Sequence, residues 1–73
     1  MVKFGAEIGY FLKNGDARIK YITFKVPFDD RHDDEVIYAL ARARVNKLYP
    51  ASSVRSLWTR PWITEYYAID LFD

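Results

Sequence analysis

The dipeptide Asn14-Gly15 constrains the fold more than any other feature of this 73-residue chain. It stands between two stretches in which apolar residues recur at every second position, as they do in a strand with one buried face. Asn-Gly is a strong hairpin signal, because a two-residue type I′ turn needs positive φ at both central residues. The sequence therefore predicts an antiparallel hairpin with strands over residues 2–12 and 17–26.

A two-residue turn also determines which residues of the two strands should face each other. With Lys13 opposite Asp16, the expected pairs are Leu12 with Ala17, Tyr10 with Ile19 and Ile8 with Tyr21. This register gives the hairpin one consistently apolar face. Gly5 and Gly9 fall on the other face, where a missing side chain indicates a bulge or the close approach of another group.

A helix is predicted to follow the hairpin. Pro27 ends the second strand, because it has no N–H to donate to the sheet. The acidic loop over residues 28–35 suits a helix start, and Pro50 stops a helix expected over residues 33–48. The apolar stripe of this helix should contain Val36, Ile37, Leu40, Ala41, Ala43 and Leu48. Arg44 falls near the middle of the stripe, where an arginine must snorkel, pair or lie beyond the sheet.

The remainder of the chain is expected to complete the sheet. Residues 54–59 read as a third strand. Residues 62–72 extend that strand past a kink, form a fourth strand or fray as a tail, and the sequence leaves these three alternatives open. The expected architecture is a single α+β domain over residues 1–73, with one helix on a small antiparallel sheet in the order strand-strand-helix-strand.

The composition argues against several classes of function. The chain has no cysteine, which excludes disulfides and thiolate metal sites, and its net charge of +1 lacks the basic excess typical of proteins that grip phosphates. Neither a membrane-spanning run nor a signal peptide is present, so we expect a protein of the cytoplasm. We also expect no enzyme, cofactor or metal site, since no catalytic motif occurs and His32 with its neighbouring aspartates reads as a capping loop.

Residues 54–67 carry the strongest functional signal. This segment holds both tryptophans, two tyrosines and two arginines, and these residue types dominate binding hot spots. We therefore expect a protein-binding surface formed by Arg55, Trp58, Arg60, Trp62, Arg42 and Arg44. Three alternatives remain: the aromatic residues fill the core, they stack on nucleic-acid bases while the arginines contact phosphates, or residues 54–56 pair with a second copy.

The order of several short motifs resembles that of a known family. Phe24-Lys25-Val26-Pro27 closes a strand, Asp34-Glu35 leads into an alanine-rich helix with Leu40-Ala41, Tyr49-Pro50-Ala51 follows, and the next strand ends in Arg60-Pro61. This order, over residues 10–61, is similar to that of the small bacteriophage-encoded inhibitors of bacterial RNA polymerase.

The resemblance implies a non-enzymatic regulator that acts in the cytoplasm of the host bacterium. Such proteins bind RNA polymerase and inhibit initiation, by displacing the σ factor or by blocking promoter DNA. The β′ subunit, together with β, is the expected contact, and the family's Arg-Pro position maps onto Arg60. The family's other arginine position is Trp58 here, so the region of β′ that is contacted stays open. We expect a monomer that does not bind nucleic acid directly.

Overall fold

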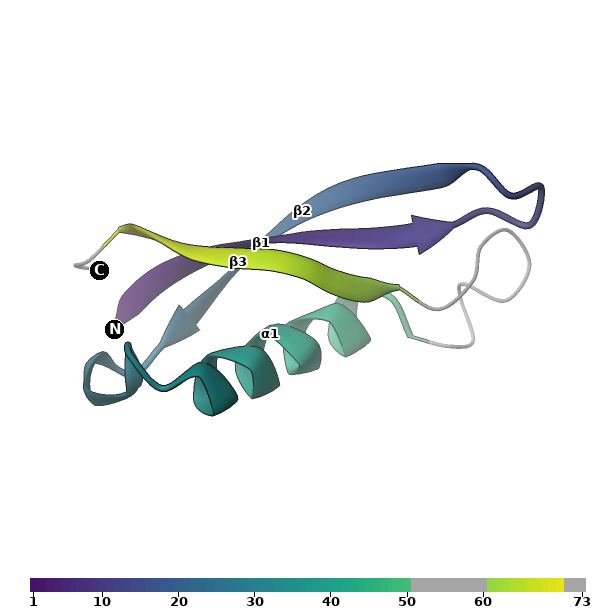
Figure 1. The fold of residues 1–73 in the computed structure, drawn as a ribbon. Helices are drawn as coiled ribbons and strands as arrows, with labels where there is room; N and C mark the ends of the chain where they lie inside the picture. Colours follow the sequence, from purple (N-terminus) through teal and green to yellow (C-terminus); the bar gives the residue numbers. More distant parts are fainter. Residues whose placement is uncertain (51–60, 71–73) are drawn as a thin grey trace.

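The fold is a three-stranded antiparallel sheet with one helix packed on it, the α+β arrangement expected from the sequence (Figure 1). The computed structural model describes residues 1–50 and 61–70. Its elements are β1 (Val2–Phe11), β2 (Ala17–Val26), the 3-10 turn η1 (Phe28–Asp30), α1 (Asp34–Leu48) and β3 (Trp62–Asp70). The strand order is β2-β1-β3, so the first strand of the chain lies at the centre of the sheet.

Of the three alternatives for the C-terminal segment, the structure excludes a frayed tail over residues 62–70. β3 pairs antiparallel with β1, with register shifts between Lys3 and Phe4 and between Glu7 and Ile8. Residues 62–70 of that segment therefore form a strand of the sheet. The strand expected over residues 54–59 lies outside the described residues.

The hairpin forms as expected, but its turn is one residue longer than predicted. The Gly15 N–H donates to the Leu12 carbonyl at 2.9 Å, and the Leu12 N–H donates to the Asp16 carbonyl at 2.8 Å. Gly15 has a φ of 94°, whereas no non-glycine residue of the described chain, Asn14 included, has positive φ. A type I′ turn is therefore excluded, and the loop is a three-residue connection that closes on a glycine with positive φ.

The longer turn shifts the register by one residue, which corrects the predicted pairing. Tyr10 lies opposite Arg18 and Ile8 opposite Lys20, so Ile19 and Tyr21 do not join the apolar face. A shift of one residue turns every side chain of a strand to the other face of the sheet. The residues of β2 that reach the core are instead Ile22, Phe24 and Val26. Alternation alone did not separate the two registers, because β2 has apolar residues on both faces.

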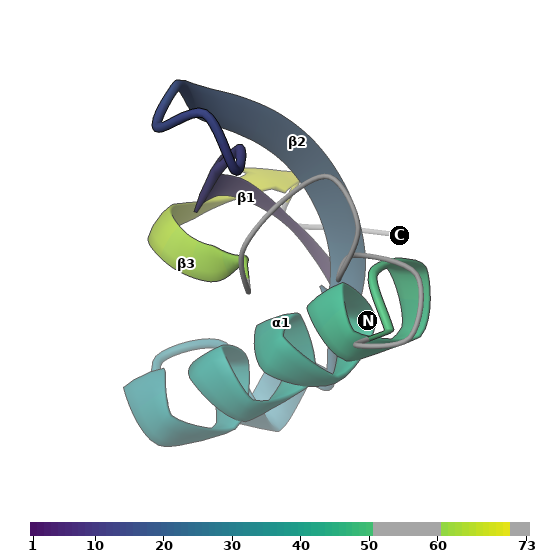
Figure 2. The same cartoon turned by 90° about the vertical axis from the view of Figure 1, so that its right-hand side faces the viewer.

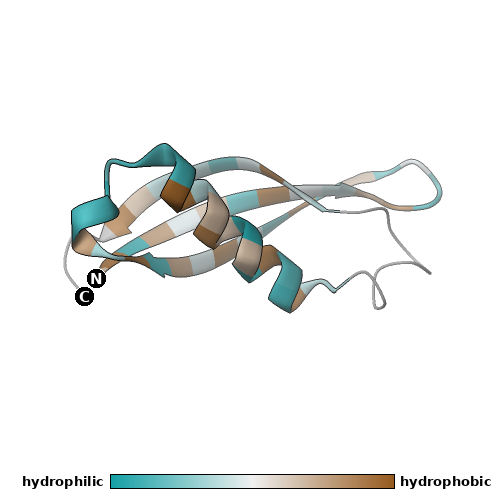
Figure 3. Ribbon diagram, turned by 90° about the horizontal axis from the view of Figure 1, so that it is seen from below, coloured by the Kyte–Doolittle hydropathy of each residue, from teal (hydrophilic) through white to brown (hydrophobic). Residues whose placement is uncertain are grey.

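The core lies between α1 and one face of the sheet. Seen end on, the strands curve above the helix, and no other described element covers the opposite face (Figure 2). From the helix side, α1 crosses the strands with hydrophobic and hydrophilic residues alternating along its ribbon (Figure 3). The buried cluster contains Val2, Phe4, Ala6, Ile8, Ile22, Phe24, Val26, Ile37, Ala41 and Val45.

The buried stripe of α1 differs in part from the predicted one. Ile37 and Ala41 are buried as expected, but Val45 joins them in place of Ala43 and Leu48, which are exposed. These three buried positions are spaced four residues apart, so they lie on one narrow face of the helix. The helix start agrees with its predicted capping, because the Asp33 carboxylate accepts the N–H groups of Glu35 and Val36.

Candidate protein-binding surface

The predicted binding residues fall into two groups in the structure. Arg55, Trp58 and Arg60 lie outside the described residues. Trp62, Arg42 and Arg44 are described, and they occupy different places. The three described residues of the predicted surface therefore do not form one patch.

Trp62 opens β3 on the face of the sheet that points away from the helix. Its ring packs against Phe11 with centroids 5.2 Å apart, and the side chain remains 37% exposed. The same ring lies over Gly9, where an added Cβ would come within 3.0 Å of the indole. The close approach predicted for this glycine is therefore made by an aromatic side chain of the neighbouring strand.

The two helix arginines are positioned differently from Trp62 and from each other. Arg42 is half-buried, and its Nη1 donates to the carbonyl of Pro61 at 3.4 Å, which ties α1 to the start of β3. Arg44 is also half-buried, and its Nε is buried with no hydrogen-bond partner in the described part of the chain. Arg44 faces β2, so it does not share a surface with Trp62.

A pair of tyrosines spans the uncovered face at the other glycine of β1. Tyr67 donates its hydroxyl hydrogen to the Tyr21 oxygen at 2.7 Å, with ring centroids 6.1 Å apart. The Tyr21 hydroxyl lies directly over Gly5, where an added Cβ would collide with it unless the phenol moved. The hydrogen bond with Tyr21 raises the pKa of Tyr67 to about 12, with smaller contributions from desolvation and from nearby negative charge.

Together these side chains form an apolar surface on the uncovered face of the sheet. We call this set the open-face cluster, and all of its members are at least 37% exposed: Phe11, Ile19, Tyr21, Trp62, Tyr67 and Ile69. Sequence reasoning found Trp62 but missed the others. The available signal was the pair Gly5 and Gly9, because glycines in a central strand leave room for rings from both neighbours.

The acidic loop before α1 has local structural roles. Asp33 caps the helix, and the Arg31 guanidinium lies 3.8 Å from the centre of the Phe28 ring while its Nη1 donates to the Phe28 carbonyl. Across the described residues, no group of three or more His, Cys, Asp or Glu side chains is placed to hold a metal ion. Within this loop, Asp33 therefore serves as the helix cap and Arg31 packs on its neighbour Phe28.

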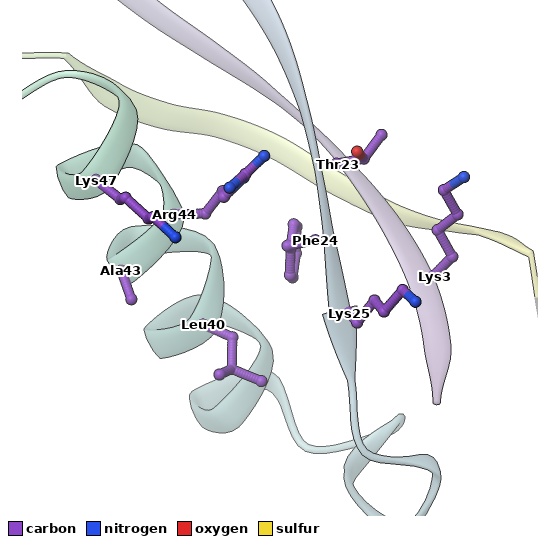
Figure 4. Close-up of a pocket in the computed structure, with 8 residues that line it drawn as sticks. All are labelled: Lys3, Thr23, Phe24, Lys25, Leu40, Ala43, Arg44 and Lys47. Atoms are coloured by element: carbon purple, nitrogen blue, oxygen red, sulfur yellow. The ribbon is translucent and has the colours of Figure 1, made fainter. Parts of the chain in front are cut away.

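A second candidate site is a basic groove between α1 and the outer strand β2. Its volume is about 430 Å³, and Figure 4 draws the side chains that line it. Four of its eight lining residues are cationic and none is acidic: Lys3, Lys25, Arg44 and Lys47. We refer to this feature as the basic groove. Sequence reasoning singled out Arg44 but gave no reason to group it with the three lysines, which come from three different elements.

Compared with protein-family models, with curated proteins and with solved structures, the chain gives no match. Within the described residues, no helix has the length and apolar character required to cross a bilayer.

Proposed function

We propose that this chain is a non-enzymatic, phage-type regulator that binds bacterial RNA polymerase and inhibits the initiation of transcription. The observation that carries the binding role is the open-face cluster. Exposed apolar groups gathered on one face are typical of interaction sites, and aromatic side chains contribute much of the binding energy at such sites. Trp62 and Phe11 are in contact, so they offer a partner one continuous anchor.

The choice of polymerase as the partner rests on the motif order over residues 10–61. That stretch ends immediately before Trp62, so Arg60, the residue that maps onto the family's Arg-Pro position, is two residues from the open-face cluster in sequence. We propose that Arg55, Trp58 and Arg60 act together with Trp62 on the β′ subunit, with β as a further contact. Inhibition then follows from displacement of σ or from obstruction of promoter DNA.

Binding of the purified chain to purified bacterial RNA polymerase tests this proposal. Immobilised chain should retain the core enzyme, and the Trp62→Ala variant should bind at least about tenfold more weakly, since removal of a hot-spot aromatic costs on the order of 2 kcal/mol. Tyr38→Ala is the matched control, because Tyr38 is an exposed aromatic residue on α1, away from this face. Failure of core and holoenzyme alike to bind would refute the proposal.

The mode of inhibition is measured in a transcription assay on a defined promoter. Addition of the chain before polymerase meets DNA should reduce the number of transcripts started, whereas addition after elongation begins should have no effect. Recovery of σ as a free subunit would identify σ displacement, and retention of σ would identify obstruction of DNA.

A nucleic-acid-binding role is the second candidate, and the basic groove favours it. Lys3, Lys25, Arg44 and Lys47 concentrate positive charge in a chain whose net charge is only +1. This role requires that affinity for an oligonucleotide fall steeply as salt rises, because each neutralised phosphate releases counterions. It also requires Arg44→Gln to reduce the salt dependence.

A further inference from the structure

The basic groove follows the outer edge of β2. It is lined by three consecutive residues of that strand, Thr23, Phe24 and Lys25. Successive side chains of a strand point to opposite faces, and here Thr23 and Lys25 are exposed while Phe24 is buried on the core side. A single groove that contacts all three residues must run along the edge of β2, because only there is it open to both faces of the strand.

The sheet order places this edge on the outside. β1 is the only described strand that pairs with β2, and it occupies the other side. In an antiparallel ladder, alternate residues direct their N–H and C=O groups toward one neighbour and the intervening residues direct theirs to the opposite side. Part of the backbone of residues 23–25 therefore presents donors and acceptors to the groove.

The walls of the groove supply positive charge on both sides of this backbone edge. Arg44 and Lys47 come from α1, together with the apolar side chains of Leu40 and Ala43 (Figure 4). Lys3 and Lys25 lie across from them, and these two residues are cross-strand partners. The Nε of Arg44 is buried without a hydrogen-bond partner in the described part of the chain.

We infer that the basic groove binds an extended acidic segment of a protein, which adds a strand to the edge of β2. The backbone of the segment pairs with the backbone of β2, and its carboxylates meet Arg44 and Lys47 on one side and the lysines on the other. The inference deepens the proposed function and rests on it in one respect, since it takes the occupant to be part of a protein partner.

Two observations favour a peptide over a nucleic acid in this groove. An edge strand offers carbonyl acceptors as well as N–H donors, and a phosphate backbone has no donors to match them. Base stacking needs an exposed ring, whereas Phe24, the aromatic residue that lines the groove, is only 7% exposed and stacks on Phe4 at 5.9 Å. The chemistry of the groove therefore matches an acidic strand.

The test uses a synthetic peptide of alternating glutamate and valine, long enough to span β2. Titration of the full chain with this peptide should give saturable binding that weakens with salt, and a lysine-valine peptide should not bind. Amide hydrogen exchange should slow at alternate residues of β2 near Thr23. Arg44→Gln combined with Lys47→Gln should weaken binding at least about tenfold.

Two controls separate strand addition from simple charge attraction. Lys13→Gln removes one positive charge at the exposed hairpin turn and should leave affinity unchanged. A glutamate-valine peptide with alternate backbone nitrogens methylated keeps its charge but cannot pair along a strand, so its binding should be lost. Equal binding of the methylated peptide would overturn the inference, as would tighter binding of a single-stranded oligonucleotide than of the acidic peptide.

Failure of the inference is distinguishable from failure of the proposed function. If the chain binds the peptide through Arg44 and Lys47 but does not bind polymerase, the result supports strand binding in the groove and refutes polymerase as the partner. If the double substitution leaves polymerase binding unaffected and the peptide does not bind, only the inference that the groove binds an acidic strand is overturned.

Discussion

The two faces of the sheet are built from alternate residues of the same central strand, yet they are filled in different ways. On the core face, β1 contributes Val2, Phe4, Ala6 and Ile8, which are between 0 and 4% exposed against α1. On the open face the same strand contributes Gly5 and Gly9, and the space above them is occupied by rings from the strands on either side. The core face is filled by the strand's own side chains, whereas the open face is filled above its two glycines by side chains of the neighbouring strands.

Because of this difference, the core face of the sheet serves folding and the open face is available for binding a partner. The core face removes apolar side chains from water, which stabilises the fold by about 25 cal/mol per Å². The open face leaves its large side chains in contact with solvent, so that their burial is still available to a partner. Substitutions on the two faces should therefore act on different measurements, stability for one and binding for the other.

The largest contrast is expected between two isoleucines on adjacent strands. Ile8→Ala removes a fully buried side chain and should lower the free energy of unfolding by about 2–5 kcal/mol. Ile19→Ala truncates a side chain that is 69% exposed, and it should change the free energy of unfolding by no more than about 0.5 kcal/mol. Urea denaturation measures both values. Similar losses for the two variants would show that the faces do not differ in the way described.

A smaller effect is expected where the open face is itself tightly packed. Gly5→Ala places a methyl group against the Tyr21 hydroxyl, so the phenol must swing away and give up its bond to Tyr67. We expect the free energy of unfolding to fall by about 1 kcal/mol. This value is at the low end for overpacked substitutions, because the displaced group is the far end of a flexible side chain.

A double-mutant cycle gives the control for this glycine. With Tyr21→Ala as the background, Gly5→Ala should be neutral or stabilising by about 0.5 kcal/mol, since alanine suits a strand better than glycine once the space is free. A loss that persists in that background would mean that the backbone, and not the ring above it, demands glycine.

The smallest effect concerns the proton shared by the two tyrosines. The bond to Tyr21 raises the pKa of Tyr67 from about 10 to about 12, so the folded chain holds this proton more tightly than the unfolded chain. The resulting stability is fully present below pH 10 and is lost as the pH rises through 12. Tyr21→Phe should return the pKa of Tyr67 toward its ordinary value in a tyrosinate absorbance titration.

Tyr38→Phe is the matched control for that titration, because Tyr38 is an exposed tyrosine on α1. The Tyr38→Phe substitution should leave the pKa of Tyr67 at its raised value. An unchanged Tyr67 titration in the Tyr21→Phe variant would show that the hydrogen bond is not the cause of the raised pKa.

The sequence predicts where helices and strands lie more reliably than it predicts which of their side chains face the core. Both hairpin strands and the extent of α1 follow from alternation, Pro27, the acidic cap at Asp33 and Pro50, which are local signals. The register is different, because Asn14-Gly15 fits a two-residue and a three-residue loop alike. The choice between them depends on which apolar set of β2 meets α1, and that contact is made between residues distant in sequence.

The candidate site was less predictable for the same reason. Trp62 could be identified from its residue type, but the open-face cluster brings together members of three strands, and β3 pairs with β1 across most of the chain. The grouping of Arg44 and Lys47 with Lys3 and Lys25 likewise depends on the strand order β2-β1-β3. For Arg55, Trp58 and Arg60, the predicted role remains a prediction.

The central place of β1 has a consequence for how the chain matures as it is synthesised. β1 is synthesised before the other elements of the sheet, but one of its two partners is β3, and the Thr64 hydroxyl donates to the Glu7 carbonyl across 57 positions of sequence. Contacts between such distant residues close late and slow the folding of small domains. The nascent hairpin and helix are therefore complete while one side of β1 is still unpaired, and the sheet is completed only when β3 has been synthesised.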